Sequence, residues 1–459
     1  MPNPKITFVG AGSTVFMKNI VGDVLQRPAL KDARIALMDI NPQRLEESAV
    51  IAGKLVQTLG TKASIETFSD QRKALEGADF VVVCFQIGGY DPCTITDFEV
   101  PKKFGLRQTI ADSLGIGGIM RGIRTVPHLW AICEDMLAVC PEAIMLQYVN
   151  PMAINTWAIA AKYPTIKQVG LCHSVQGTAM ELAHDLDIPY SEIRYRSAGI
   201  NHMAFYLKIE KNGVDLYPRL FKAMDDKKIF DSNKVRFELM RRLGHYVTES
   251  SEHNDEYTCW FIPHGKANID KFSIPLDEYL RRCDGIVDEF DRLKKFAKSN
   301  EPMKAVNKSH EYCSIIMKSI VSGVPSVIYG NLPNGCTISN LPRTAIVEAP
   351  TLVDRNGLHH AQIGELPPQL IGYMQPHVTQ HELFIRAAME GRRDHIYQAV
   401  MFDPMTAALL TLDQIVEMCD ELIAAHGDLL PPIDSKKTLV PTSGKSFKAV
   451  DARDLRKSW

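Results

Sequence analysis

Long apolar runs are missing from this chain of 459 residues. None reaches the roughly 18 consecutive apolar residues that a membrane-spanning helix needs, so we expect no transmembrane segment. The first apolar run covers only residues 6–9, which is too short for the apolar core of a signal peptide. We therefore expect a cytoplasmic protein.

The chain also lacks basic blocks and a cysteine framework. Its formal net charge is −2, which argues against nucleic acid or an anionic membrane as a partner. The 10 cysteines have no regular spacing, which indicates reduced thiols rather than a disulfide scaffold. With 45% hydrophobic and 23% charged residues, the composition is that of a globular protein.

A glycine turn near the start of the chain indicates a dinucleotide site. Residues 5–9 are predicted as a strand, and a helical pattern over residues 14–26 follows Gly10 and Gly12. Glycines at this place let the backbone approach a pyrophosphate, which the first amide groups of the helix can bind. The predicted cofactor-binding residues of this turn are Gly10, Gly12, Ser13 and Thr14.

An acid at the end of the second strand indicates which cofactor binds. Residues 34–38 are predicted as this strand, and Asp39 follows it. A carboxylate there accepts a hydrogen bond from a ribose 2′-hydroxyl and repels a 2′-phosphate, which favours NAD over NADP. Val15 stands in place of the third glycine of the usual motif, so a nucleotide-free α/β fold is the alternative.

Apolar strands alternate with helical patterns over the first part of the chain. Residues 78–84, 144–149 and 166–171 are typical of strands buried on both faces. They predict an α/β protein with an N-terminal Rossmann-type doubly wound parallel sheet, in which ligands bind beyond the carboxyl ends of the strands. Polar or small residues at these ends should converge on one crevice, namely Gly12, Asp39, Gln86, Asn150 and Cys172.

A glycine-rich segment, residues 112–118, lies between two of these strands. It is predicted as a loop headed by Asp112, with Arg121 and Arg124 on the helix that follows. Functional residues concentrate on loops that a rigid scaffold holds, which makes Asp112 a candidate. A flexible loop with solvated arginines is the alternative.

The chain is too long for one ordinary core, so two packed domains are expected. After about residue 195, long helical segments mix with irregular stretches. We expect an NAD-binding domain at residues 1–195 and a mixed α+β domain at 196–430 for substrate, metal and oligomerisation. The polar segment 431–459 is predicted as a loose C-terminal tail.

Cys172 and His202 each follow a predicted strand and lie about 30 residues apart. A thiolate and an imidazole are ligands of divalent transition metals, and two protein ligands leave positions open for substrate. We predict that they hold a metal beside a nicotinamide, with Mn²⁺, Fe²⁺, Co²⁺ and Ni²⁺ all compatible. The alternative is a buried thiol and a hydrogen-bonded histidine in an ordinary dehydrogenase.

Taken together, these motifs resemble glycoside hydrolase family 4, and within it the α-galactosidases. The resemblance runs from residue 5 to about residue 430, and its most discriminating part is the Cys-His-Ser-Val sequence of residues 172–175. Members that act on phosphorylated sugars carry an arginine in the segment corresponding to residues 87–99, where this chain has neither Arg nor Lys. The resemblance therefore implies unphosphorylated α-galactosides, such as melibiose, as substrates.

The resemblance also implies a mechanism that differs from the two-carboxylate chemistry of most glycosidases. In this family, NAD⁺ oxidises C3 of the sugar, and a base then removes the acidified proton at C2. The group at C1 is eliminated, water adds, and NADH returns the hydride to C3. The implied cofactors are NAD and a divalent metal, with Mn²⁺ as the first choice, held by Cys172 and His202.

The proton-transfer roles are likewise implied by the resemblance. Tyr257 would be the base at C2, with Asp112 tuning or orienting it, and Asn150 would bind the sugar. A tyrosine with an ordinary pKa near 10 is a poor base at neutral pH unless a cation lowers that pKa. His173 would be the general acid, although phosphoglucosidase members have an aspartate at this position.

Other functions fit parts of the same pattern. An α-galacturonidase of the family would differ only in the groups that recognise C6, where a carboxylate needs an Arg or Lys. A sugar dehydrogenase would release NADH, and an NAD-binding sensor would leave Cys172 and His202 unexplained. The resemblance further implies a homodimer or homotetramer.

Overall fold

The computed structural model describes residues 3–299 and 301–433. Most of the predicted C-terminal tail, residues 434–459, lies outside the described residues. Over the part that is described, no helix is long and apolar enough to cross a membrane.

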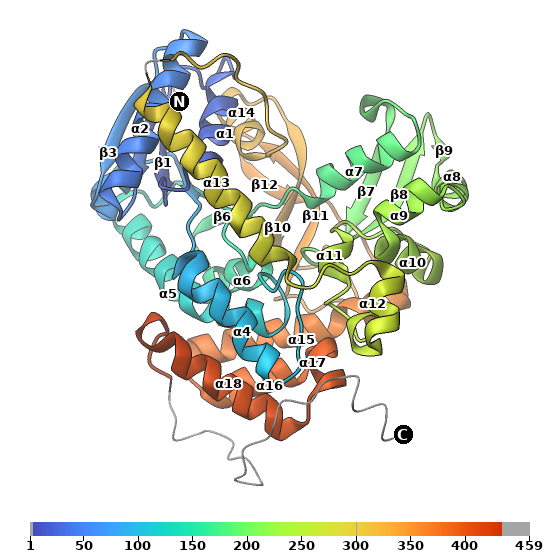
Figure 1. The fold of residues 1–459 in the computed structure, drawn as a ribbon. Coiled ribbons are helices and arrows are strands. Elements are labelled where there is room, and N and C mark those ends of the chain that lie inside the picture. Colours follow the sequence, from blue (N-terminus) through green and yellow to red (C-terminus); the bar gives the residue numbers. More distant parts are fainter. Residues whose placement is uncertain (1–2, 300, 434–459) are drawn as a thin grey trace.

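A nine-stranded sheet forms the centre of the described structure (Figure 1), in the order β12-β11-β10-β6-β5-β4-β1-β2-β3. The strands from β6 to β3 are parallel, which confirms the predicted Rossmann-type sheet. The strands of this sheet are β1 Lys5–Val9, β2 Arg34–Met38, β3 Ser64–Phe68, β4 Phe80–Val83, β5 Ile144–Gln147, β6 Lys167–Gly170, β10 Ser326–Pro333, β11 Ile346–Asp354 and β12 Gly357–His360.

Helices cover the sheet and continue into a helical layer at the bottom of Figure 1. In the first half of the chain they are α1 Thr14–Leu25, α2 Pro42–Leu59, α3 Gln71–Leu75, α4 Ile95–Lys103, α5 Gly115–Val139, α6 Met152–Lys162 and α7 Ser174–Asp185. Those that follow are α8 Tyr217–Ala223, α9 Lys227–Ser232, α10 Lys234–Leu243, α11 Ser251–Asn254, α12 Lys266–Phe272, α13 Glu278–Lys298, α14 Cys313–Ser322, α15 Pro368–Glu390, α16 Arg393–Met401, α17 Pro404–Leu409 and α18 Leu412–His426.

The glycine-rich segment 112–118 is only partly a loop, which corrects the sequence prediction. Helix α5 already begins at Gly115, because the glycines let the preceding loop lie directly on its first turn. A Cβ atom on Gly117 would lie 2.3 Å from the carbonyl oxygen of Ala111, and one on Gly118 would lie 2.6 Å from the backbone of Ser113. The glycines therefore serve close packing rather than flexibility.

The second half of the chain completes the sheet of the first half. Strand β10 pairs antiparallel with β6 through Asn331 and Gly170, and β11 and β12 extend the sheet. Strands β10 and β11 thus belong to the main sheet, through a long-range pairing that local sequence does not show. The division of the chain at residue 195 stays a proposal.

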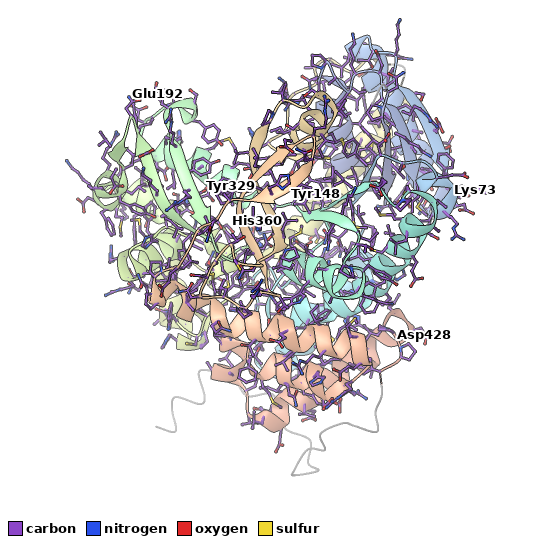
Figure 2. The ribbon with its side chains drawn as sticks, turned by 180° about the vertical axis from the view of Figure 1, so that it is seen from behind. Lys73, Tyr148, Glu192, Tyr329, His360 and Asp428 are labelled. Carbon is purple, nitrogen blue, oxygen red and sulfur yellow. The ribbon has the colours of Figure 1, made fainter. Side chains whose placement is uncertain are left out.

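A smaller antiparallel sheet stands beside the large one. It consists of β7 Arg194–Ala198, β8 Phe205–Lys211 and β9 Val214–Asp215. Tyr329 of β10 lies where the two sheets meet (Figure 2), and its ring stacks on that of Tyr195 with 5.5 Å between the ring centroids. A backbone bridge between Gly199 and Glu348 adds a second connection, so β7 is held against β11.

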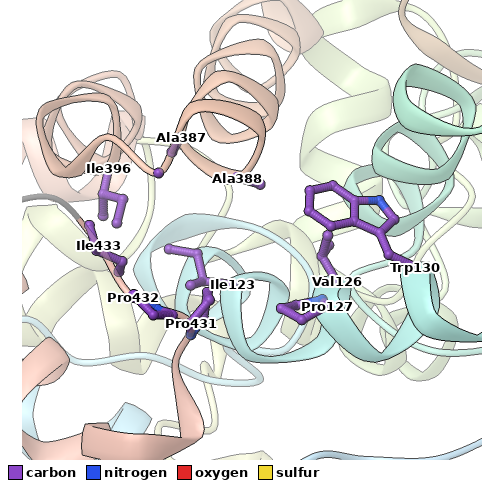
Figure 3. A pocket seen from close by; sticks show the side chains of 11 residues that line it. Ile123, Val126, Pro127, Trp130, Ala387, Ala388, Ile396, Pro431, Pro432 and Ile433 are labelled. Atoms are coloured by element: carbon purple, nitrogen blue, oxygen red, sulfur yellow. The ribbon is translucent and has the colours of Figure 1, made fainter.

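An apolar cavity of about 150 Å³ lies between α5, α15 and residues 431–433 (Figure 3). The side chains that line it include Ile123, Trp130 and Ile396. None of the predicted site residues lines this cavity, so the chemistry has to be sought at the strand ends.

A buried ion pair fastens the helical layer to the N-terminal half. The guanidinium of Arg124, on α5, donates to both carboxylate oxygens of Asp97, on α4. The ring of His426, at the end of α18, approaches the same carboxylate at 2.8 Å. Burial disfavours protonation of this ring, but Asp97 outweighs it and raises the pKa of His426. The alternative of a solvated Arg124 is therefore wrong, because the side chain is fully buried.

Replacing Asp97 should strongly destabilise the fold. Asp97→Asn keeps the volume but leaves the buried Arg124 without a counter-charge, which we expect to lower the free energy of unfolding by about 3 kcal/mol. Urea denaturation measures this change. The matched control is Glu99→Gln on the same helix, whose exposed pair with Lys102 should contribute less than about 1 kcal/mol. Equal losses in both variants would contradict the role of the buried pair.

Candidate active site and metal centre

The glycine turn after β1 is shaped by its neighbours. Gly10 has a φ of 91°, in the region that favours glycine, and a Cβ atom there would lie 2.7 Å from the carbonyl oxygen of Cys84. The Gly12 amide donates to Asp39 Oδ2 at 2.7 Å, and a Cβ on Gly12 would collide with that carboxylate. The structure thus brings together the predicted cofactor residues of both strand ends.

Two further residues of the predicted cofactor site flank the start of α1. Ser13 directly precedes this helix and offers its backbone at the turn. The Thr14 side chain is buried and its hydroxyl lies 2.9 Å from Ser48 Oγ, so a role of Thr14 in cofactor binding stays a prediction. The amide groups at the amino end of α1 are the groups suited to a pyrophosphate.

Three potential metal ligands converge beyond the carboxyl end of β6. Their donor atoms, on Cys172, His202 and Glu249, all lie within 4.8 Å of one another. Cys172 comes from the turn between β6 and α7, and His202 from the turn between β7 and β8 with a φ of 66°. Glu249 lies just before α11, and its Oε2 is 3.3 Å from His202 Nε2. Sequence reasoning predicted the first two of these residues and missed Glu249.

The electrostatics of this cluster favour a cation. Burial, followed by the carboxylates of Glu348 and Glu249, raises the pKa of the Cys172 thiol far above its usual value. Burial also opposes ionisation of Glu249, but the rings of His253 and His202 outweigh it and lower the pKa of that carboxyl to about 2. A thiol, an imidazole and a carboxylate in one buried place fit a divalent first-row metal, because a dication favours the thiolate and shields the carboxylate.

Tyr257 touches this cluster through a histidine. Its hydroxyl lies 2.9 Å from His202 Nδ1, while Nε2 of the same ring faces Glu249. His377 Nε2 donates to the Tyr257 carbonyl at 2.8 Å from the opposite side. Burial, with Glu256, Asp112 and Glu249, raises the pKa of the Tyr257 hydroxyl well above 10. Without a cation in the cluster, this phenol is a weak acid and stays protonated at neutral pH.

Asp112 and Asn150 form the next part of the site. The Asn150 amide donates to Asp112 Oδ2 at 3.0 Å, and Ser113 donates to Oδ1. Arg121 lies 3.9 Å from the same carboxylate and donates to the Tyr279 hydroxyl, so the alternative of a solvated arginine is wrong here as well. Burial opposes ionisation of Asp112, but Arg121 and the nearby histidines outweigh it and lower the pKa of the carboxyl.

His173 occupies a different position from the other predicted residues. Its side chain is 74% exposed, and its Nδ1 lies 3.6 Å from Glu311 Oε1. Glu311 comes from the segment before α14, a partner that no local sequence signal reveals. The ring therefore stands at the rim, next to the metal cluster in sequence and open to solvent.

Comparisons with known proteins agree over almost the whole chain. Residues 5–188 match the profile of family 4 glycosyl hydrolase, and residues 197–406 match that of its C-terminal domain. An α-galactosidase of Bacillus subtilis (strain 168) is 43% identical, over 93% of this chain and 99% of its own length. An α-galactosidase of Rhizobium meliloti (strain 1021) is 31% identical, over 99% of this chain and 96% of its own.

The fold has close counterparts among solved structures. A 6-phospho-α-glucosidase from gut microorganisms, in complex with NAD and Mn²⁺, superimposes with a TM-score of 0.81 at 18% identity, covering 94% of this chain and all of the other. At this identity the likeness concerns the fold alone. Two profiles that together cover most of the chain, and relatives alike from end to end, show that it belongs to glycoside hydrolase family 4.

Proposed function

We propose that the protein hydrolyses unphosphorylated α-galactosides, using NAD⁺ and a divalent metal. The observation that carries the proposal is the Cys172–His202–Glu249 cluster, which contacts the Tyr257 hydroxyl through His202. The two α-galactosidases that resemble the chain from end to end support the choice of substrate. Family members of other specificity share the fold, so the substrate rests on this closer similarity.

The cofactor would lie on the glycine turn. The amino end of α1 would bind the pyrophosphate of the cofactor. The Asp39 carboxylate, which already accepts from the amides of Gly12 and Asn41, would use its remaining lone pairs to accept a hydrogen bond from a ribose hydroxyl. When bound, NAD⁺ would take the hydride from C3 of the sugar and return it at the end of the cycle. A 6-phospho-α-glucosidase of the same fold was solved with NAD and Mn²⁺, which supports this pair of cofactors.

The metal would be Mn²⁺, with Cys172, His202 and Glu249 as ligands and sugar oxygens completing its coordination. When bound, it would polarise the oxygens of the sugar and lower the pKa of nearby groups. A cytoplasmic location would keep the Cys172 thiol reduced and available as a ligand. We also propose a homodimer or homotetramer, as the family resemblance implies.

The chain's own residues would then move the protons. Tyr257, hydrogen-bonded to His202, would remove the proton at C2. Asp112 would orient Tyr257 and hold the Asn150 amide in place. The free amide atoms of Asn150 would bind a sugar hydroxyl. His173 would protonate the departing oxygen, and Glu311 lies 3.6 Å from its ring.

A galacturonide is the second candidate substrate, because Arg121 places a buried cation beside Asp112 and Asn150. Its Nε has no hydrogen-bond partner among the described residues. The charge of Arg121 is, however, already opposed by Asp112, and its guanidinium packs over the Tyr279 ring. An α-galactoside, which has a neutral C6 group, therefore fits better.

Substrate preference tests this choice. We expect 4-nitrophenyl α-galactoside to be cleaved with a higher kcat/KM than 4-nitrophenyl α-galacturonide or the 6-phosphate of the galactoside. Release of 4-nitrophenol measures all three rates, with NAD⁺ and Mn²⁺ held constant. A preference for the galacturonide would identify Arg121 as the group that recognises a C6 carboxylate.

The elimination route predicts exchange at C2. Tyr257 can trade the proton it removes for deuterium, so galactose released in D₂O should carry deuterium at C2, as measured by NMR or mass spectrometry. Omission of either NAD⁺ or Mn²⁺ should abolish both hydrolysis and exchange. Direct displacement at C1 leaves C2 untouched, so galactose without deuterium would exclude the proposed elimination route.

Loss of a ligand should remove the metal and leave the cofactor. Cys172→Ser and Glu249→Gln should each weaken Mn²⁺ binding about 10- to 100-fold or more, while the NAD⁺ affinity changes little because the glycine turn is separate. Isothermal titration calorimetry measures both affinities. Glu252→Gln, in the same acidic segment but outside the cluster, is the control. Full activity of Cys172→Ser without added metal would refute the ligand assignment.

A further inference from the structure

The carboxylate of Glu256, next to Tyr257, is buried and holds a loop rather than a cation. Its Oε2 accepts from the amides of Thr109 and Ile110 at 2.8 and 3.1 Å. Its Oε1 accepts from the Ala111 amide at 2.8 Å. The loop gripped in this way is the one that ends in Asp112.

Asp255 also binds the loop before Asp112. Its Oδ1 accepts from the Thr109 hydroxyl at 2.8 Å. No cationic side chain of the described residues forms an ion pair with Asp255 or Glu256, and burial raises the pKa of Glu256 to about 7 although three amides favour its charge. Burying two acids without a cation disfavours folding, so their contacts with the loop call for a functional reason.

The loop is also fixed from its opposite side. Ala111 has a φ of 54°, which is unfavourable for a residue with a side chain. Its carbonyl lies so close to Gly117 of α5 that a Cβ there would be 2.3 Å away. The backbone before Asp112 is thus clamped between Glu256 and the first turn of α5.

We propose that Glu256 is a positioning residue that sets Asp112 against Tyr257. Glu256 and Tyr257 are consecutive, as are Ala111 and Asp112, so one hydrogen bond between Glu256 and Ala111 joins the neighbours of the proposed base and of the acid that orients it. Glu256 itself touches no reacting atom; it acts through these two residues. The inference rests on the proposed function, because it assigns Tyr257 to the proton at C2.

The variant Glu256→Gln tests the clamp. It keeps the shape of the side chain, but its amide nitrogen must face backbone amides that are also donors, so the loop and Asp112 shift. A misplacement of about 1 Å costs on the order of 100-fold in rate, so we expect kcat to fall about 10- to 100-fold. The NAD⁺ affinity should change less than about twofold, because the glycine turn is not altered.

Isotope effects separate positioning from general damage. If proton removal at C2 becomes slower, the effect of deuterium at C2 should rise above the wild-type value. The effect of deuterium at C3 should fall towards one, because hydride transfer then equilibrates before the slow step. A lower kcat with both isotope effects unchanged would indicate a merely structural role and overturn the inference. Wild-type kinetics of Glu256→Gln would also overturn it.

Two controls keep the test decisive. Glu252→Gln, in the same segment but paired with Arg282, should leave both isotope effects unchanged. If circular dichroism shows that Glu256→Gln is unfolded, Thr109→Val is the second variant, because it removes the hydroxyl that contacts Asp255 and also acts on Glu256. It should shift the isotope effects in the same direction, and no shift would refute the inference. If the wild-type enzyme releases galactose without deuterium at C2, the proposed elimination route and the inference fall together. If the wild-type enzyme exchanges the C2 proton and Glu256→Gln has unaltered kinetics, only the inference is refuted.

Discussion

An excess of buried negative charge around one tyrosine is the constraint on which the site depends. Burial raises the pKa of the Tyr257 hydroxyl, and Glu256, Asp112 and Glu249 raise it further. The same surroundings keep the Cys172 thiol protonated. Both groups need the opposite state for the proposed chemistry, which a dication at Cys172, His202 and Glu249 would provide. Metal binding and base strength are therefore coupled by electrostatics.

His202 is the residue through which this coupling runs. One ring nitrogen faces the Glu249 carboxylate and the other meets the Tyr257 hydroxyl. Behind the cluster, Glu348 accepts from Asn331 at 3.1 Å, and burial raises the pKa of its carboxyl to about 7. The bridge between Glu348 and Gly199 then holds the turn that carries His202. The antiparallel strands β10 and β11 thus support the proposed metal site as well as the sheet.

The backbone is most firmly held where the proposed proton transfer at C2 would require it. The loop before Asp112 is clamped by Glu256 and by the glycines of α5, and His377 holds the Tyr257 backbone from the far side. His173, in contrast, lies exposed at the rim with Glu311. This contrast suits the two roles: a base that abstracts a carbon-bound proton needs a fixed distance, whereas a general acid exchanges its proton with water between turnovers.

The sequence by itself determined the parallel sheet, the glycine turn and the acid at the end of β2. These features follow from local rules: apolar runs, glycine next to a strand, and the shared edge of parallel strand ends. The motif at residues 172–175 and the family resemblance pointed to Cys172, His202 and Tyr257. Only the tertiary structure placed Glu249 beside them, because the sequence alone does not distinguish this residue from the other acids of its segment. It also revealed Glu311, Glu256 and buried Arg121, because their partners come from distant parts of the chain. Such pairings depend on how β10 and β11 join the sheet and how α5 begins, which no local pattern encodes.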